Sequence, residues 1–406
     1  MRYCRRTVLS ALAAGAVGVA GCSGDQSPDG NGGTDGGTPA ESSPSIGGVT
    51  GTWQTAGGPT NQANRIDGVS GSGPEPPFTR VWSDGDINTG FNLIGPDGRF
   101  YNHDSSSQSG GITVVDAAMG SDEWSTPIDD GSDAIGRPLW VDEDAVICSY
   151  GAVSPSDGSR LWERVNTDRF RGQCADATGL YGQGFDAGQP RPVRKRGVDD
   201  GKQRWSYDLS EVQSARPKFV ADGRLFARGR ADGDEVTLTL DAETGRDSRI
   251  FDSGAPAAVD DRFYYLRGGG SLSAVDPDSG ETAWDVATEP YNFVVGDERF
   301  YYLDRSAGSI LAREKASGDE LWSVSLGVRT VAFLFGAGDR IYVSGVQGGG
   351  TSEESLTAQT TALTPGGEQA WSTDGFLAQF VTEQAVYGST IQSDTPVMGG
   401  YVPQAE

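Results

Sequence analysis

The sequence predicts an all-β protein built from repeated four-stranded antiparallel units, and two periodic signals carry this prediction. The first is a glycine followed four positions later by a tryptophan, at Gly120/Trp124, Gly158/Trp162, Gly201/Trp205, Gly280/Trp284, Gly318/Trp322 and Gly367/Trp371. The second is an arginine that opens an aromatic strand after a turn-like residue, in Gly98–Tyr101, Gly223–Phe226, Asp261–Tyr265, Glu298–Tyr302 and Asp339–Tyr342. Trp82 and Trp371 are 289 positions apart, which is seven steps of about 41 residues. Four strands within such a period, with no helical pattern, are typical of a β-propeller blade.

The segment AVDPDSGETAWD, residues 274–285, shows why each unit should contain a hairpin. Apolar and polar residues alternate on both sides of its DPDSG turn, as two paired strands require. Pro277 fixes one backbone angle of the turn, and Gly280 can adopt the left-handed conformation that closes it. Trp284 is large enough to seal the hairpin against its neighbour. One further unit keeps this spacing but has Arg249 at the tryptophan position.

Residues 1–21 predict an export signal. The apolar run from Val8 to Ala20 is shorter than the roughly 20 residues that span a bilayer. The adjacent Arg5 and Arg6 resemble a twin-arginine signal, and VAGC resembles a lipobox in which Cys22 becomes the lipid attachment site. The expected location is the outer face of the cytoplasmic membrane, with the body extracellular and lipid-anchored. The alternative is ordinary cleavage that leaves Cys22 unmodified.

The sequence predicts a disordered tether over residues 22–50 and the propeller over residues 51–406. Gly, Ser, Asp, Thr and Pro dominate the tether, so it cannot bury enough apolar surface to offset its ordering entropy.

The composition indicates a protein adapted to concentrated salt. The formal net charge is -25, only four residues are Lys, and 39 Asp stand against 18 Glu. This pattern resembles proteins of salt-loving archaea, in which salt screens the repulsion between carboxylates, and it predicts unfolding at low salt. A chain so acidic is not expected to bind nucleic acid, which requires a basic face.

The repeat A-x-D-x-x-[ST]-G-x-x-x-W resembles that of the pyrroloquinoline-quinone (PQQ) type β-propeller family. It is best kept in residues 274–284 and partly kept in residues 114–124 and 239–245. The resemblance runs from about Trp53 to the C-terminal end, and Thr52–Arg65 is similar to the segment that precedes the first blade in such proteins. The resemblance implies the fold, which both enzymes and non-catalytic proteins use.

Seven tryptophan-position strands follow Trp82, so seven blades are complete by about residue 372. Pairing Thr79–Trp82 with the strands after Trp371 would make an eighth, composite blade and close the ring without an exposed edge. Eight blades are therefore expected, and seven blades with a loose tail are the alternative.

No catalytic, cofactor-binding or metal-ligating residue is predicted. The resemblance implies, for the PQQ alcohol dehydrogenases of this repeat type, a calcium ion held by Glu, Asn and Asp, but no position here matches those ligands. His103, the sole histidine, is expected in a solvated Ser-rich loop. The favoured function is a non-catalytic binding or assembly platform, similar in repeat type only to the propeller lipoproteins of bacterial outer-membrane assembly. A PQQ- and calcium-dependent dehydrogenase, or another propeller enzyme, is the alternative.

Two further features invite structural tests. Cys148 and Cys174 lie on strands of successive units, where they either form a disulfide or are separate small buried residues. The stretch from Arg191 to Arg230 holds 11 basic residues against five acidic ones. Its tip, Arg191, Arg194, Lys195 and Arg196, is a candidate docking patch for an anionic partner, either a protein or a surface glycan. The alternative is that these arginines pair with the acidic surface of neighbouring blades.

Overall fold

The computed structural model describes residues 46, 65–66, 69–84, 93–104, 111–126, 135–162, 170–184, 191–252, 254–288, 290–304, 307–328, 330–347, 357–392 and 395–404. The chain divides into two units, residues 1–42 and 43–406, and every described residue belongs to the second. The export signal with Arg5 and Arg6, the lipid-attachment residue Cys22, and the tether apart from Ile46 lie outside the described residues.

The described part of the chain contains strands and no helix, in line with the all-β prediction. Each of the first four sheets is a four-stranded antiparallel blade in sequence order. Blade 1 has β3 (Leu93–Ile94), β4 (Arg99–Asp104), β5 (Gly111–Asp116) and β6 (Asp122–Ser125). Blade 2 has β7 (Pro138–Val141), β8 (Val146–Cys148), β9 (Ala152–Val153) and β10 (Arg160–Trp162). Blade 3 has β11 (Phe170–Asp176), β12 (Gly179–Gly184), β13 (Val193–Arg196) and β14 (Gln203–Tyr207). Blade 4 has β15 (Ser214–Ala221), β16 (Arg224–Ala231), β17 (Asp234–Asp241) and β18 (Arg249–Phe251).

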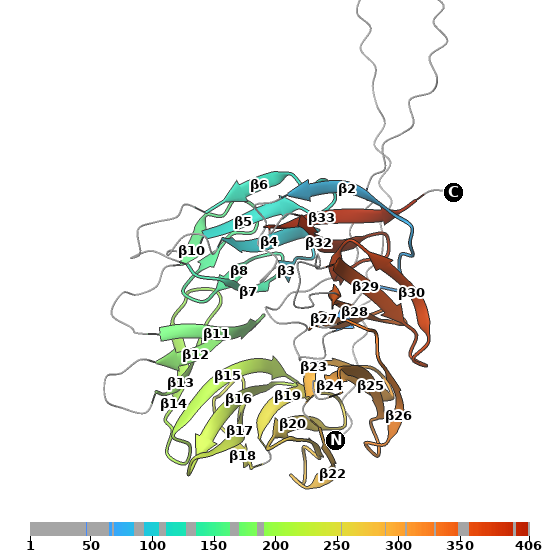
Figure 1. Cartoon of the computed structure of the whole chain (residues 1–406). Coiled ribbons are helices and arrows are strands. Elements are labelled where there is room, and N and C mark those ends of the chain that lie inside the picture. Colours follow the sequence, from blue (N-terminus) through green and yellow to red (C-terminus); the bar gives the residue numbers. More distant parts are fainter. Residues whose placement is uncertain are drawn as a thin grey trace, which may run out of the picture. The chain divides into compact units, whose positions relative to one another are not determined.

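The remaining four sheets complete the propeller (Figure 1). Blade 5 has β19 (Ala255–Val259), β20 (Tyr264–Gly268), β21 (Ser271–Val275) and β22 (Thr282–Ala287). Blade 6 has β23 (Pro290–Val295), β24 (Arg299–Asp304), β25 (Ser309–Glu314) and β26 (Glu320–Val324). Blade 7 has β27 (Thr330–Ala337), β28 (Arg340–Gln347), β29 (Thr357–Leu363) and β30 (Gln369–Asp374). Blade 8 has β31 (Leu377–Val381), β32 (Val386–Gln392), β33 (Thr395–Pro403) and β2 (Phe78–Asp84).

The two ends of the repeat array share blade 8. Strand β2 pairs antiparallel with β33, from Phe78 opposite Pro403 to Asp84 opposite Met398 (Figure 1). This pairing confirms the composite eighth blade, and the seven-blade alternative is wrong. The Trp82 indole, 8% exposed, packs in the core of this closure with Phe100 of blade 1 and Tyr387 of blade 8.

One strand was not expected from the sequence. Strand β1 (Arg65–Ile66) pairs parallel with β27, so it extends blade 7 at its first strand. The chain that follows stays on blade 7, because the Gly71 carbonyl accepts from the Asp339 amide at 2.9 Å and the Ser72 carbonyl accepts from the Tyr342 hydroxyl at 3.2 Å. At Ile46 the structure also differs from a wholly disordered tether, since this side chain is buried in the cluster that contains Trp82.

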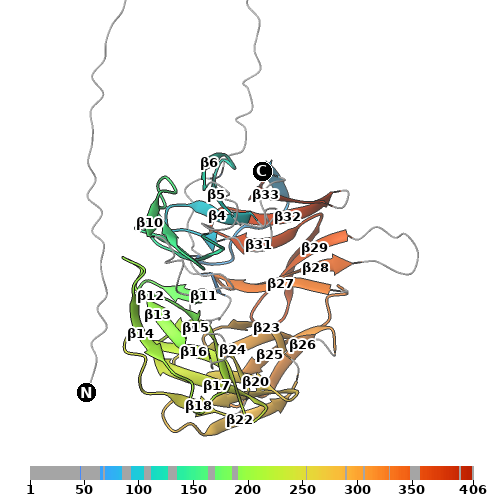
Figure 2. The same ribbon diagram turned by 90° about the vertical axis from the view of Figure 1, so that its left-hand side faces the viewer.

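The first strand of each blade lies nearest the propeller axis. First strands of successive blades contact one another, for example β3 with β7 and β7 with β11. Figure 2 shows the same arrangement for β23, β27 and β31. In blades 2 to 8 a register shift places one extra residue in the first strand relative to the second, which defines a β-bulge. The extra residues are Leu139, Gln173, Lys218, Ala257, Asn292, Ala332 and Gln379. Lys218 is the charged member of this set.

The core consists of hydrophobic clusters, several of which contain aromatic rings that join neighbouring blades. The second sequence signal forms the starts of second strands β4, β16, β20, β24 and β28, as expected. Between blades 5 and 6, for example, Trp284 stacks on Phe300 with ring centroids 5.3 Å apart and planes 7° apart. Each such contact buries large apolar area, which is the main stabilising contribution between blades.

Candidate functional site

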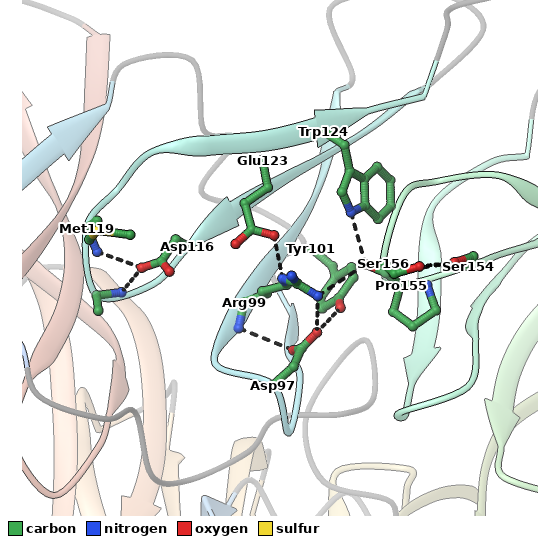
Figure 3. Close-up of polar contacts among 11 residues, drawn as sticks. Asp97, Arg99, Tyr101, Asp116, Met119, Glu123, Trp124, Ser154, Pro155 and Ser156 are labelled. Carbon is green, nitrogen blue, oxygen red and sulfur yellow. Dashed lines mark hydrogen bonds and ion pairs between the residues drawn. The ribbon is translucent and has the colours of Figure 1, made fainter. Parts of the chain in front are cut away.

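The tryptophans of the repeat bind the turn of the next blade. Each indole Nε1 donates to the carbonyl of the residue after the turn's first position. The six described bonds are Trp82 to Ala117 at 3.0 Å, Trp124 to Pro155 at 2.9 Å, Trp162 to Val198 at 2.7 Å, Trp205 to Ala242 at 3.2 Å, Trp284 to Lys315 at 2.9 Å and Trp322 to Pro365 at 2.9 Å. Figure 3 shows the Trp124 bond.

The glycine of each turn makes room for this indole. Gly201 has a φ of 65°, and a Cβ at this position would lie 2.4 Å from the Trp162 ring, so only glycine permits the approach. The turn's aspartate holds the loop in shape: Asp116 Oδ1 accepts from the amides of Ala118 and Met119, both at 2.8 Å (Figure 3). The glycine, aspartate and tryptophan of the repeat therefore shape the turn and pack neighbouring blades together.

Trp371 is an exception that follows from the composite blade. Its indole packs edge-on against Phe78 at 5.6 Å, and within the described residues its Nε1 has no hydrogen-bond partner. In the other blades the acceptor lies in the turn between the third and fourth strands. Blade 8 has no such turn, because β33 and β2 come from opposite ends of the array.

Arg249 replaces the tryptophan between blades 4 and 5. Its guanidinium donates to the carbonyl of Pro277, the position that an indole binds elsewhere, and to Asp278 O at 3.1 Å. Gly280 is correspondingly uncovered, since a Cβ there would meet only Phe251, at 3.8 Å. The hydrogen bond of the repeat is kept, but the stacked ring is lost.

Restoring the ring should stabilise the protein. We expect Arg249→Trp to raise the free energy of unfolding by about 0.5–2 kcal/mol, since the indole would cover Gly280 and keep a donor for the Pro277 carbonyl. Arg249→Ala is the control and should cost about 1 kcal/mol through the lost hydrogen bonds. Chemical denaturation measures both, and an Arg249→Trp protein no more stable than the parent would contradict the expectation.

Arginines of the second sequence signal reinforce two of these contacts. Arg99 Nη1 donates to the Pro155 carbonyl at 3.4 Å and to Asp97 Oδ2 at 3.1 Å, while its Nε pairs with Glu123 (Figure 3). Arg299 likewise donates to the Pro365 carbonyl at 2.6 Å. The arginine therefore joins the indole at one carbonyl of the next blade, a role that the sequence pattern did not reveal.

A buried ion pair links blades 5 and 6. Lys315 Nζ lies 2.7 Å from Asp260 Oδ2, and the two side chains are 4% and 8% exposed. Asp260 also accepts from the Tyr265 hydroxyl at 2.8 Å and from the amides of Arg262 and Phe263. Burial alone would raise the pKa of Asp260, but the hydrogen bonds from Lys315 and the two amides lower it below its ordinary value.

Two of the four residues of the candidate docking patch are buried, so the prediction of an exposed patch is wrong at these two positions. Lys195 and Arg196 are each only 5% exposed. Lys195 Nζ donates to Thr178 Oγ1 at 3.0 Å and to the Ala242 carbonyl at 3.1 Å. The Arg196 guanidinium lies over the Phe170 ring, 4.9 Å from its centroid. Lys195 therefore faces blade 4, whereas Arg196 lies on Phe170, which packs with residues of blade 2.

The other two patch residues differ from each other: Arg191 is exposed, and Arg194 is half-buried. Elsewhere in the stretch, the ion pairs among described residues form within single blades, for example between Arg204 and Asp200 of blade 3 at 3.0 Å, and not with a neighbouring blade as the alternative expected.

Cys148 and Cys174 are separate free thiols, and both are buried. The disulfide alternative is therefore not realised, and the alternative of small buried residues holds. Burial raises the pKa of both thiols above the ordinary value. We expect maleimide to label neither residue in the folded protein and both after denaturation, as read by peptide mass spectrometry. Labelling of either thiol under folding conditions would contradict this expectation.

His103 lies within strand β4, opposite Ile112, and is half-buried, so the expected loop position is wrong. Over the described ranges, no group of three or more His, Cys, Asp or Glu residues could hold a metal ion. In the same part of the chain, no helix has the length and apolar character needed to cross a membrane.

A pocket of about 340 Å³ opens where blades 4, 5 and 6 meet. Its wall includes Arg228, Arg267, Gly268, Ser271, Thr288 and Tyr291. Arg228 lies in β16, and Arg267, Gly268 and Ser271 lie on either side of the connection between β20 and β21. Thr288 lies in the connection between β22 and β23, and Tyr291 lies near the start of β23. This end of the blades is opposite the Asp/Gly turns. Its volume lies within the range of small-ligand sites. The pocket and the exposed loops around it are the candidate binding surface.

The charge at this pocket is positive. Arg267 Nη1 donates to the Pro290 carbonyl at 3.5 Å, and Arg228 forms an ion pair with Glu235. In the sequence Arg228 is distinguished only as a member of the basic stretch, and no pattern distinguishes Arg267, which belongs to the next blade.

Comparison with known proteins finds similarity to one curated protein and to several solved structures. The chain is 26% identical over 228 residues to the outer membrane protein assembly factor BamB of Yersinia pestis, covering 54% of this chain and 50% of that protein. It therefore spans about half the length of this relative. The crystal structure of BamB from Moraxella catarrhalis matches with 15% identity and a TM-score of 0.49, over 82% of this chain and 99% of that chain. The WD40 domain of SCAP from fission yeast matches with 10% identity and a TM-score of 0.45, over 80% and 97%.

The model of the family described as outer membrane protein assembly factor BamB matches residues 151–288 and 268–395. These two matches overlap and together cover more than half of the 406 residues. They include the turn of each of blades 2 to 7 and the tryptophan of each of these blades except blade 4, which has Arg249 at that position. The chain therefore belongs to the family of outer membrane protein assembly factor BamB, and it is a PQQ-like repeat β-propeller.

Proposed function

We propose that this protein is a non-catalytic platform that binds a protein partner and supports assembly. The observation that carries the proposal is membership in the BamB family across blades 2 to 7. The geometry supports it, because the repeat residues are used between blades while the loops and the pocket at blades 4 to 6 are available to a partner. A protein, rather than a surface glycan, is the proposed partner because the family is described by assembly.

The platform is proposed to be held at a membrane by a lipid on Cys22, with residues 22–50 as the tether. Arg5 and Arg6 would direct export, and the propeller would lie on the outer face of the cytoplasmic membrane. Mass spectrometry of the N-terminal peptide should find a lipidated Cys22, and Cys22→Ser should move the protein from the membrane fraction to the soluble fraction. A membrane-bound Cys22→Ser protein would argue against the lipid anchor.

Crosslinking in native membranes, followed by purification through a tag on the protein, tests the platform. We expect one or a few specific protein partners that are lost when crosslinker is omitted before solubilisation. A second arm adds PQQ and Ca²⁺ to the purified protein in high salt. A cofactor absorbance that survives desalting, together with alcohol or sugar oxidation, would replace the platform with a quinoprotein dehydrogenase. Neither signal is expected.

A further inference from the structure

Four cationic residues of blades 4 and 5 lie in the wall of the pocket or on the strand beside it. Arg228 and Arg267 line it directly. Arg216 in β15 lies directly opposite Arg228 in β16, and Lys218 occupies the bulge two residues further along β15. Figure 1 shows β15 and β16 beside β19 and β20. All four side chains are exposed. We refer to these four residues as the cationic cluster.

The cluster is electrostatically unfavourable in the protein alone. Like charges directly opposite on paired strands are destabilising, and Arg216 and Arg228 are such a pair. Partial burial, followed by the positive charges of Arg228, Arg267 and Arg216, lowers the pKa of Lys218. Such an arrangement indicates that an anion would be stabilised where the four groups meet.

Compensation by the protein's own carboxylates is small. In the part of the chain that the structure describes, Glu235 pairs with Arg228, whereas Arg216 and Lys218 form no ion pair. This is unexpected in a chain with 57 acidic and 32 basic residues. At the bulge position occupied by Lys218, the other blades with a bulge have the neutral residues Leu, Gln, Ala or Asn.

We propose that the cationic cluster is the recognition site for an acidic peptide segment, whose carboxylates bind Arg267 in the wall of the pocket at blades 4 to 6 and Lys218 beside it. The inference rests on the proposed platform function and names the chemistry of the partner. Guanidinium groups bind carboxylates through paired hydrogen bonds, and Arg267 in the pocket wall presents such a group.

A peptide fits the site better than a long polyanion. The pocket of about 340 Å³ accommodates a few side chains rather than an extended polymer. Outside the cluster the surface of this strongly acidic protein repels a uniformly charged chain, whereas a peptide can carry its carboxylates at one short segment.

Fluorescence anisotropy with fluorescein-labelled hexaglutamate tests the proposal, using the full chain at the lowest KCl concentration that maintains its fold. We expect saturable binding that weakens as KCl rises. The double variant Lys218→Gln/Arg267→Gln should bind at least tenfold more weakly. Arg246→Gln is the matched control, because Arg246 is an exposed arginine beyond the other end of β17, and it should bind like the parent. Unchanged melting temperatures would confirm that both variants fold.

Competition experiments separate the ligand classes. Unlabelled hexaglutamate should displace the probe, whereas hexaglutamine should not. Displacement by inorganic phosphate or polygalacturonate at equal charge concentration would overturn the peptide assignment, as would equal binding by the double variant and Arg246→Gln.

The membrane crosslinking experiment repeated with the double variant separates this inference from the platform itself. Loss of the partner in the double variant supports both. A partner recovered equally well by the double variant overturns the cluster as recognition site and leaves the platform intact. Hexaglutamate binding in a protein that captures no partner would overturn the platform, and with it the identification of the cluster as a partner site.

Discussion

Replacing Lys315 with Met is expected to lower the free energy of unfolding by about 3–5 kcal/mol, because it removes one partner of a buried ion pair. The Asp260 carboxylate would remain 8% exposed without the ammonium that lies 2.7 Å from it. Lys315 Nζ also donates to the Gly296 carbonyl of blade 6 at 3.2 Å. The backbone carbonyl of Lys315 that accepts from Trp284 is unaffected by this change, so the effect reports on the side chain.

Chemical denaturation at constant salt measures this effect, with Lys202→Met as the control. Lys202 pairs with Asp200 at 3.3 Å, but its side chain is 79% exposed, so its loss should cost at most about 1 kcal/mol. Adding Asp260→Asn to Lys315→Met should recover part of the loss, since no buried charge then remains. Equal costs for Lys315→Met and Lys202→Met would contradict the buried-pair argument.

The pH dependence of the same pair has a defined sign. The pKa of Asp260 is lowered in the folded protein, so its stabilising contribution is present at neutral pH and is lost as the pH falls through that lowered value. In Lys315→Met the burial of Asp260 is no longer offset by the ammonium. As the pH falls, Asp260 would therefore become protonated in the variant before it does so in the parent, and protonation removes the unpaired buried charge. The stability difference between parent and variant should therefore narrow as the pH is lowered from neutral.

Transfer to dilute buffer is expected to unfold the protein. The net charge of -25 brings strong repulsion between carboxylates when salt no longer screens it. Several turn aspartates, such as Asp157 and Asp276, are bound to local hydroxyls and amides rather than to cations. Repulsion then competes with a total stability of only about 5–15 kcal/mol.

Far-UV circular dichroism and thermal melting across a KCl dilution series measure this response. The midpoint temperature should fall steadily with KCl, and the strand signal should disappear in dilute buffer. Sucrose at matched osmotic strength is the control and should not replace the salt, because it does not screen charge. A melting point that is the same in dilute buffer and in concentrated KCl would refute adaptation to salt.

The blade architecture was predictable because the repeat fixes both ends of a hairpin. Gly280 and Trp284 each have one geometric role, so their recurrence identifies the turn and the outer strand in every copy. The composite eighth blade was predictable by the same reasoning, since Trp82 occupies the tryptophan position of an outer strand but has no turn before it. Strand β1 carried no such signal, because two residues that pair with the edge of blade 7 belong to no repeated sequence pattern.

The binding surface was less predictable, because the sequence shows where charged residues stand but not which way their side chains point in the fold. Lys195 and Arg196 are consecutive in a basic stretch, but β13 turns both toward covered faces. The three exposed cations of that stretch that belong to the cationic cluster, Arg216, Lys218 and Arg228, lie further along the chain. Arg267 joins them only through the packing of blade 5 on blade 4, a contact that no local pattern encodes.

The composite blade also has a consequence for how the protein is made. Phe78 pairs with Pro403, which lies 325 positions later, so the last seam of the ring joins an early segment to a very late one. Blades 1 to 7 can form in order as the chain emerges, but β2 must wait unpaired until β33 is present. Until then the chain exposes open sheet edges, which favour aggregation. Chaperones should matter most in this interval. A chain whose synthesis ends before residue 395 would be an unclosed propeller with unpaired, aggregation-prone strand edges, not a smaller closed one.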